Sequence, residues 1–112
     1  MKISGIDGKE YTIEPEASLR DANLTGADLS GADLNRANLS NADLREARLS
    51  GADLSGASLR GAYLIRADLT DVCLNEADLG GAKLTNANLS GAVWNDETVF
   101  PEGFEIPEKS GT

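Results

Sequence analysis

The sequence predicts an all-β solenoid, a chain that turns once every five residues around a narrow core of leucine and alanine. Leucine recurs at every fifth position through residues 19–89 without a gap, and Trp94 takes the next position. Alanine stands two residues before each of these positions, and Val72 is the one exception. Residues 17–96 therefore form sixteen five-residue units.

A five-residue period is incompatible with the usual regular elements. In an α-helix five residues advance about 500°, so successive leucines would scatter around the axis and no apolar stripe would form. In a flat strand side chains alternate between faces, so alternate leucines would point in opposite directions. Burying every leucine requires one turn in each unit, with alanine and leucine pointing inward together. Stacked coils would then satisfy one another's backbone groups, which leaves the number of sides open.

The three residues between successive alanine–leucine pairs have the composition of a corner. The position before leucine is mostly Asp, Asn or Ser, and the position after it is mostly Ser, Thr or Asn. The next position is often Gly or Asn, which tolerate a positive φ. Charged residues also occupy it, so we expect that a left-handed backbone is not obligatory there and that turn types vary along the rod; these residues are Arg36, Glu46, Arg66, Asp71 and Glu76.

The A-[D/N]-L-x-x run resembles the pentapeptide-repeat family over residues 17–96, about 70% of the chain. This resemblance implies a right-handed quadrilateral β-helix with four units, or twenty residues, in each coil. The sixteen units would then make about four coils, stacked at about 4.8 Å like neighbouring strands of a sheet.

A period of twenty residues can be checked on the charges that it would stack. Asp28, Arg48 and Asp68 would form one column of alternating charge, and unlike neighbours of this kind are mildly favourable. Glu46 and Arg66 would form another pair, whereas Asp33 and Asp53 would stack like charges. The charges thus favour twenty over fifteen residues in each coil, although not at every position.

Both ends of the repeat carry apolar segments that we interpret as caps, so the chain is expected to form a single domain. Residues 1–16 are the expected N-terminal cap, with a short strand in residues 9–14 laid across the first coil; its apolar residues are Ile3, Ile6, Tyr11 and Ile13. Residues 97–112 are the expected C-terminal cap and tail, where the segment TVFPEGFEIPE resembles tails of cyanobacterial members of the family; its apolar residues are Val99, Phe100, Phe104 and Ile106.

Composition limits the classes of function. The net charge is −9, which argues against direct binding to nucleic acid because that needs clustered Lys and Arg. One cysteine, Cys73, fits a reducing compartment. The first residues lack the apolar core of a signal peptide, and no stretch approaches the length of a membrane span. We therefore expect a cytoplasmic protein that does not enter membranes.

The unit Ala62–Arg66 departs most from the repeat and supplies the candidate binding site. It places Tyr63 and Ile65 where other units mostly carry small polar residues. With twenty residues in each coil, the same side also carries Arg45, Arg66 and Lys83. An aromatic residue beside arginine is the composition of an interaction hot spot. Simple drift of the repeat explains these residues more readily, because isolated exposed apolar residues are normal.

No residue is predicted to be catalytic or to bind a metal or a cofactor. The chain has no His and one Cys, so transition-metal sites and Ser–His or Cys–His machinery are excluded. Asp33 and Asp53 have the composition of an acid–base pair or a Ca²⁺ site, but we interpret them as solvated repeat positions, because carboxylates recur wherever the repeat recurs. Cys73 has no basic neighbour in its own unit and is interpreted as a neutral substitution.

These features predict a non-enzymatic interaction or scaffold protein with an unknown protein partner. The alternative is a mimic of DNA that inhibits a nucleic-acid enzyme such as DNA gyrase, as some family members do; the negative charge fits, but four coils are short for that role. A further expectation is an end-to-end homodimer through the C-terminal cap. An engineered consensus repeat also fits the regular pattern, although the varied outward positions look natural.

Overall fold

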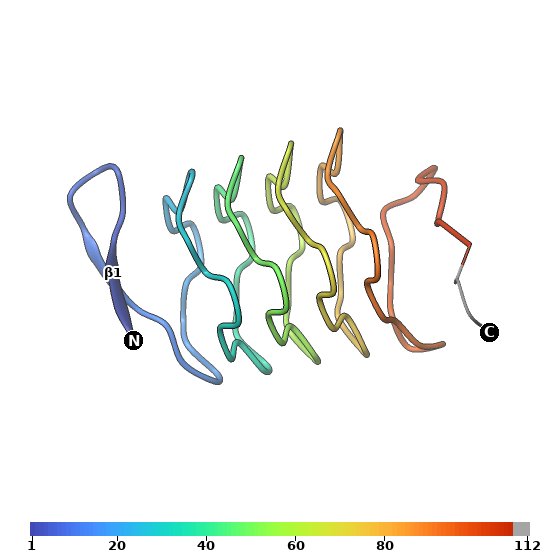
Figure 1. Cartoon of the computed structure of the whole chain (residues 1–112), viewed down its shortest axis with the longest axis horizontal. Helices are drawn as coiled ribbons and strands as arrows, with labels where there is room; N and C mark the ends of the chain where they lie inside the picture. The colour runs from blue at the N-terminus through green and yellow to red at the C-terminus, as the bar shows by residue number, and fades with distance from the viewer. Residues whose placement is uncertain (109–112) are drawn as a thin grey trace.

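The computed structural model describes residues 1–108 and shows a rod made of stacked coils, 41 × 22 × 19 Å in extent. Two short strands come first, β1 (Lys2–Ser4) and β2 (Glu10–Thr12), and they pair antiparallel as a hairpin. The coils follow side by side along the long axis, and the C-terminal segment lies at the far end (Figure 1).

The coils form the right-handed, four-sided β-helix that the sequence predicts. Residues twenty apart lie next to each other as parallel bridges, as in Ser18 with Asn38 and Asp33 with Asp53. The predicted twenty-residue coil is therefore confirmed. Each side of the rod presents one column of residues, and we number the columns in chain order: face 1 (Ser18, Asn38, Ser58, Asp78), face 2 (Asn23, Asp43, Tyr63, Lys83), face 3 (Asp28, Arg48, Asp68, Asn88) and face 4 (Asp33, Asp53, Cys73, Val93).

A ladder of backbone hydrogen bonds joins each coil to the next. On each face one hydrogen bond runs from a coil to the following coil and one runs back. For example, the Leu54 N–H donates to the Cys73 carbonyl at 2.9 Å, and the Cys73 N–H donates to the Ala52 carbonyl at 3.0 Å. The corners add a third bond, such as that from the Gly56 N–H to the Asn75 carbonyl at 2.9 Å. This pattern satisfies most backbone groups of the inner coils without extended strands.

Leucine and alanine side chains fill the axis of the rod. The leucines through residues 24–79 are fully buried, and no polar or charged residue among residues 1–108 is buried with them. Val72 occupies an alanine position and is also fully buried. Burial falls toward the last coil, where Leu89 and Trp94 are only half-buried. The core is thus a single stack of inward layers, and its C-terminal layer is the least covered.

The second residue after each leucine of residues 19–89 has a positive φ, so every corner has the same left-handed conformation. The expectation of varied turns was therefore wrong. Arg36, Glu46 and Arg66 have φ of 61°, and Glu76 has 63°. The alanine N–H bonds back across the corner to the leucine carbonyl, as from Ala47 to Leu44 at 3.0 Å. A positive φ at the third residue of such a turn is the mark of type II. The stacked coils impose this conformation even where the side chain disfavours it.

The preference for Asp and Asn before leucine follows from one more hydrogen bond at the corner. The side-chain oxygen of the Asp or Asn accepts from the N–H two residues later, as from Ser55 to Asp53 at 2.9 Å and from Ser40 to Asn38 at 3.0 Å. The ladder leaves this N–H without a backbone partner among residues 1–108. The Asp or Asn side chain thus supplies the acceptor that the ladder does not provide for this N–H.

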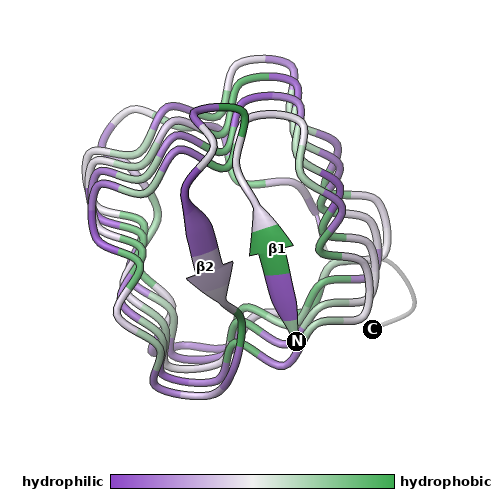
Figure 2. Ribbon diagram, turned by 90° about the vertical axis from the view of Figure 1, so that its left-hand side faces the viewer, coloured by the Kyte–Doolittle hydropathy of each residue, from purple (hydrophilic) through white to green (hydrophobic). Residues whose placement is uncertain are grey.

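The N-terminal hairpin lies across the open end of the first coil (Figure 2). The Tyr11 hydroxyl accepts a hydrogen bond from the Asn23 N–H at 3.2 Å, and Ile13 is buried against the first leucines. A Cβ on Gly5 would lie 2.5 Å from the Asn23 carbonyl oxygen, so this close approach requires glycine. Ile6, which the sequence suggested as a cap residue, lies at the hairpin tip and is 73% exposed.

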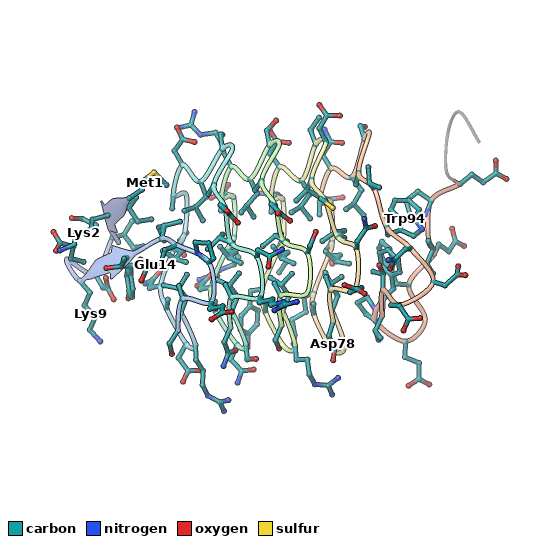
Figure 3. All side chains as sticks on the ribbon, turned by 90° about the horizontal axis from the view of Figure 1, so that it is seen from below. Met1, Lys2, Lys9, Glu14, Asp78 and Trp94 are labelled. Carbon is teal, nitrogen blue, oxygen red and sulfur yellow. The ribbon has the colours of Figure 1, made fainter. Side chains whose placement is uncertain are left out.

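The C-terminal cap begins as an imperfect continuation of the helix. Val99 pairs with Asp78, a spacing of twenty-one residues instead of twenty. Phe100 packs edge-on against Trp94, with 5.5 Å between ring centroids, and stacks on Phe104 at 5.7 Å. Figure 3 shows Trp94 at this end of the rod, far from the residues of the hairpin. Residues 109–112 of the expected tail lie outside the described residues.

Candidate functional site

Face 2 holds the candidate site, and Tyr63 stands in the middle of its column. Tyr63 pairs with Asp43 in the coil before it and with Lys83 in the coil after it. Tyr63 as a whole residue is 40% exposed, and the Lys83 ammonium lies 4.8 Å from the centroid of its ring. This cation–π contact holds the ring beside Lys83, and part of Tyr63 remains exposed to solvent.

Arg45 lies at the corner beside Tyr63 and is held by Asp43. Its Nε donates to Asp43 Oδ1 at 2.8 Å, and Nη2 donates to Oδ2 at 2.6 Å. This two-point contact lowers the pKa of Asp43 below its ordinary value and raises the pKa of Arg45. The pair fixes the direction of the Arg45 guanidinium, and the carboxylate of Asp43 partly neutralises its positive charge.

Ile65 and Arg66 occupy the next corner position along the same edge. Ile65 is half-buried between the corners of the neighbouring coils, and its carbonyl accepts from the Glu46 N–H at 3.0 Å. Arg66 is exposed and has no ion pair among residues 1–108. Glu46 stacks over Arg66 as predicted, but the two side chains do not form an ion pair. In the other predicted column, Asp28 and Arg48 do form an ion pair, with 3.7 Å between Arg48 Nη2 and Asp28 Oδ2.

The five residues that the sequence selected thus lie on face 2 and the corner after it. Two further arginines, Arg20 and Arg60, lie at the corner on the other side of face 2, and sequence reasoning missed them. Both occupy the position after leucine, forty residues apart, so a search along the twenty-residue period would have found them. They border a surface hollow whose other lining residues are Ser40, Asn41, Gly61, Gly80 and Gly81.

The alternative candidates lie mainly on face 4. Asp33 and Asp53 are neighbours, as the period predicts, and each accepts a hydrogen bond from its own corner. The Ser55 hydrogen bonds lower the pKa of Asp53. Residues 1–108 contain no group of three or more His, Cys, Asp or Glu that could hold a metal ion. Cys73 is half-buried, with its Sγ 3.0 Å from the Ser55 hydroxyl oxygen.

Comparisons with known proteins agree on the type of repeat. The family description "Pentapeptide repeats" matches residues 16–51, 42–81 and 73–93, with eight copies. No curated protein gives a significant sequence match. The part of the chain that the structure describes has no helix long and apolar enough to span a membrane.

Solved structures show the same architecture. The pentapeptide repeat protein alr5209 from Nostoc PCC 7120 is 47% identical, with a TM-score of 0.79, over 80% of this chain and 74% of that one. Rfr23, a pentapeptide repeat protein from the cyanobacterium Cyanothece 51142, is 36% identical, with a TM-score of 0.51, over 77% of this chain and 62% of that one. QnrB1, a plasmid-mediated fluoroquinolone resistance protein, is 20% identical, with a TM-score of 0.57, over 85% of this chain and 45% of that one; it shows the fold alone.

Proposed function

This chain belongs to the pentapeptide-repeat family, and we propose that it is a non-enzymatic interaction module whose protein partner docks on face 2 around Tyr63. One observation carries the proposal. The unit that places Tyr63 and Ile65 outward lacks the corner hydrogen bond that Asp or Asn makes in nine other units.

The missing hydrogen bond makes this unit less favourable for folding than the nine units that have it. Tyr63 offers no acceptor to the corner, and the Ile65 N–H has no partner among residues 1–108. A typical hydrogen bond of this kind contributes about 1 kcal/mol to stability. A large aromatic side chain that replaces such a bond on the surface is expected where the side chain has another use.

The surroundings of Tyr63 supply the other properties of a docking site. Tyr and Arg are the residues that dominate binding energy in protein interfaces, and both occur here on a rigid scaffold. The backbone under Tyr63 is held by hydrogen bonds from Tyr63 to Ala42 at 2.9 Å and from Leu44 to Tyr63 at 2.8 Å. A partner would therefore meet a surface that needs little ordering on binding.

The interior supports a role without catalysis. Leu and Ala side chains fill the axis, and the described residues place no polar or charged side chain among them. Small-molecule sites are usually concave pockets in which a few polar groups converge on the ligand. Columns of outward side chains on a stiff rod instead favour binding through an extended face.

Affinity capture from the native cell extract tests the proposal. The wild-type protein is compared with Tyr63→Ala/Ile65→Ser and with Cys73→Ala/Asn75→Ser, a matched control at the same two repeat positions on the opposite side. We expect the first variant to lose a partner that the wild type and the control retain. Circular dichroism of all three proteins checks that they are folded. Identical captured proteins from all three would refute docking on face 2.

A second candidate function is inhibition of a nucleic-acid enzyme such as DNA gyrase by imitation of duplex DNA. The net charge of −9 favours it. Four coils rise only about 20 Å, the length of about six base pairs at 3.4 Å each, which disfavours it. A DNA supercoiling assay decides: inhibition at stoichiometric protein would support this candidate, and full activity at excess protein would exclude it.

A further inference from the structure

Charge is divided unevenly around the rod, although the whole chain is acidic. We define the basic side as face 2 with its two flanking corners. It holds five of the seven Lys and Arg residues of the repeats, which are Arg20, Arg45, Arg60, Arg66 and Lys83. It holds three acidic residues, Asp21, Asp43 and Glu46, so its net charge is +2. The rest of residues 17–96 carries −6, with two basic and eight acidic residues.

Two cations on the basic side remain free of acidic partners. Arg45 is paired with Asp43, Arg60 with Asp78 at 3.2 Å, and Arg20 more loosely with Asp21 at 3.9 Å. Arg66 and Lys83 have no ion pair among residues 1–108.

The two free cations lie close to the apolar centre of the candidate site. Lys83 lies over the Tyr63 ring, and Arg66 follows Ile65 at the corner. Unpaired positive charge therefore borders the two outward apolar side chains of this unit.

The acidic residues of the opposite side do not cancel this local charge. Face 4 and its corners carry a net charge of −4, from Asp33, Asp53, Asp71, Glu76 and Asp96 against Arg36. The rod is about 20 Å across, since its short extents are 22 and 19 Å. At physiological ionic strength charges are screened within about 8 Å, so a partner close to face 2 responds mainly to the basic side.

We propose that the basic side recognises an extended acidic segment of a partner protein, with carboxylates at Arg66 and Lys83 and an apolar side chain between them on Tyr63 and Ile65. This inference rests on the proposed function and names the chemistry of the partner. Complementary charge steers association and fixes register, and the apolar centre contributes affinity. Nucleic acid fits less well, because phosphate backbones are bound through about six to ten basic contacts and this surface offers two free cations.

Binding of a short fluorescein-labelled peptide of alternating glutamate and valine, measured by fluorescence anisotropy, tests the proposal. The key variant is Arg66→Glu/Lys83→Glu. The matched control is Arg36→Glu/Arg48→Glu, which changes the net charge equally and reverses the same two repeat positions away from the basic side. We expect the key variant to weaken binding by at least about tenfold and the control by less than about threefold. Thermal melts followed by circular dichroism confirm that both variants are folded.

Several results would overturn the proposal. One is that the wild type does not bind the peptide, and another is that the key variant and the control lose peptide binding equally. A third is that a labelled DNA duplex binds more tightly than the peptide and that the key variant abolishes this binding. The last result would assign the surface to nucleic acid. If the Tyr63→Ala/Ile65→Ser variant loses its captured partner while the charge-reversal variant keeps it, face 2 binds a protein but not through acidic groups. If neither variant loses the partner, the proposed function itself fails.

Discussion

Non-glycine side chains at left-handed corners show how much the repeat can impose on a single residue. Arg36, Glu46, Arg66, Asp71 and Glu76 all adopt φ between 57° and 63°. This conformation costs an L-residue roughly 1–2 kcal/mol, and glycine avoids the cost. The hydrogen bonds of the corner to the next coil offset it, as from the Glu46 N–H to the Ile65 carbonyl at 3.0 Å.

Paired substitutions at these corners test this explanation. Gly51 has a φ of 70°, and a Cβ added there would meet no heavy atom within 4 Å, so Gly51→Ala introduces backbone strain without a clash. We expect Gly51→Ala to lower the free energy of unfolding by about 1 kcal/mol and Glu46→Gly to raise it by up to about 1 kcal/mol. Urea denaturation measures both. Equal stability of Gly51→Ala and wild type would contradict a left-handed corner.

The side chain before leucine has a local role that a substitution can isolate. Asn38 accepts the Ser40 N–H at 3.0 Å, whereas Ser18 on the same face makes no such bond among residues 1–108. We expect Asn38→Ala to destabilise the protein by about 1 kcal/mol, because the Ser40 N–H loses its acceptor. Ser18→Ala is the matched control and should change stability by less than about 0.5 kcal/mol. Equal effects in a denaturant titration would contradict this role.

At the scale of the single coil, stability comes from the inward layer of leucines. Leu54 is fully buried in an inner coil, whereas Leu89 in the last coil is half-buried. We expect Leu54→Ala to cost roughly 2–5 kcal/mol and Leu89→Ala clearly less, since less surface returns to water. Chemical denaturation of the two variants gives the comparison. The core described here would be refuted if Leu54→Ala left the unfolding midpoint unchanged.

The corner aspartates make the coils sensitive to acid. The pKa values of Asp28, Asp53 and Asp68 are lowered mainly by side-chain hydrogen bonds from the Ser or Thr two residues later. A carboxylate with a lowered folded-state pKa stabilises the protein above its unfolded pKa of about 3.9, and this stabilisation is lost as pH falls through the folded value. We therefore expect the urea midpoint to drop between pH 5 and about pH 2.

A conservative variant separates this effect from general acid unfolding. Asp53→Asn keeps an acceptor for the Ser55 N–H but does not titrate. Its urea midpoint should therefore depend less steeply on pH than that of the wild type. An identical pH profile for the two proteins would show that Asp53 does not contribute.

The regular elements were predictable from the sequence because one pattern repeats sixteen times. The leucine period requires a turn in each unit, and the charges of Asp28 and Arg48 correctly favoured twenty residues in each coil. The left-handed corners at Glu46 and Arg66 were not predictable from residue preference, because contacts between coils override it. The extra residue between Asp78 and its partner Val99 was not predictable either, because it follows the last unit of the repeat.

Prediction of the candidate site was also incomplete. Tyr63 and Ile65 stood out because they break a pattern, and the period placed Arg45 and Lys83 beside them. Which cations are free could not be read from the sequence. That depends on side-chain contacts such as Arg45 with Asp43. Arg20 and Arg60 occupy equivalent repeat positions, yet Arg20 pairs with Asp21 and Arg60 pairs with Asp78.

At the scale of the whole molecule, the two ends differ in their covering. The hairpin of β1 and β2 crosses the first coil, whereas Val93, Val99 and Ile106 remain about half exposed at the other end. An end-to-end homodimer through the C-terminal cap therefore stays a prediction. We expect Ile106→Asp to reduce the mass measured by light scattering from that of a dimer to that of a monomer. A wild-type protein that is monomeric at high concentration would exclude the homodimer.

The central claim, that a protein partner docks on face 2, is tested most directly by site-specific crosslinking. The photoreactive residue p-benzoylphenylalanine replaces Tyr63 in one variant and Asp53, on the opposite face 4, in another. We expect that, on irradiation in native cell extract, the label at position 63 forms one discrete crosslinked protein and the label at position 53 does not. The same product from both positions, or from position 53 alone, would contradict it.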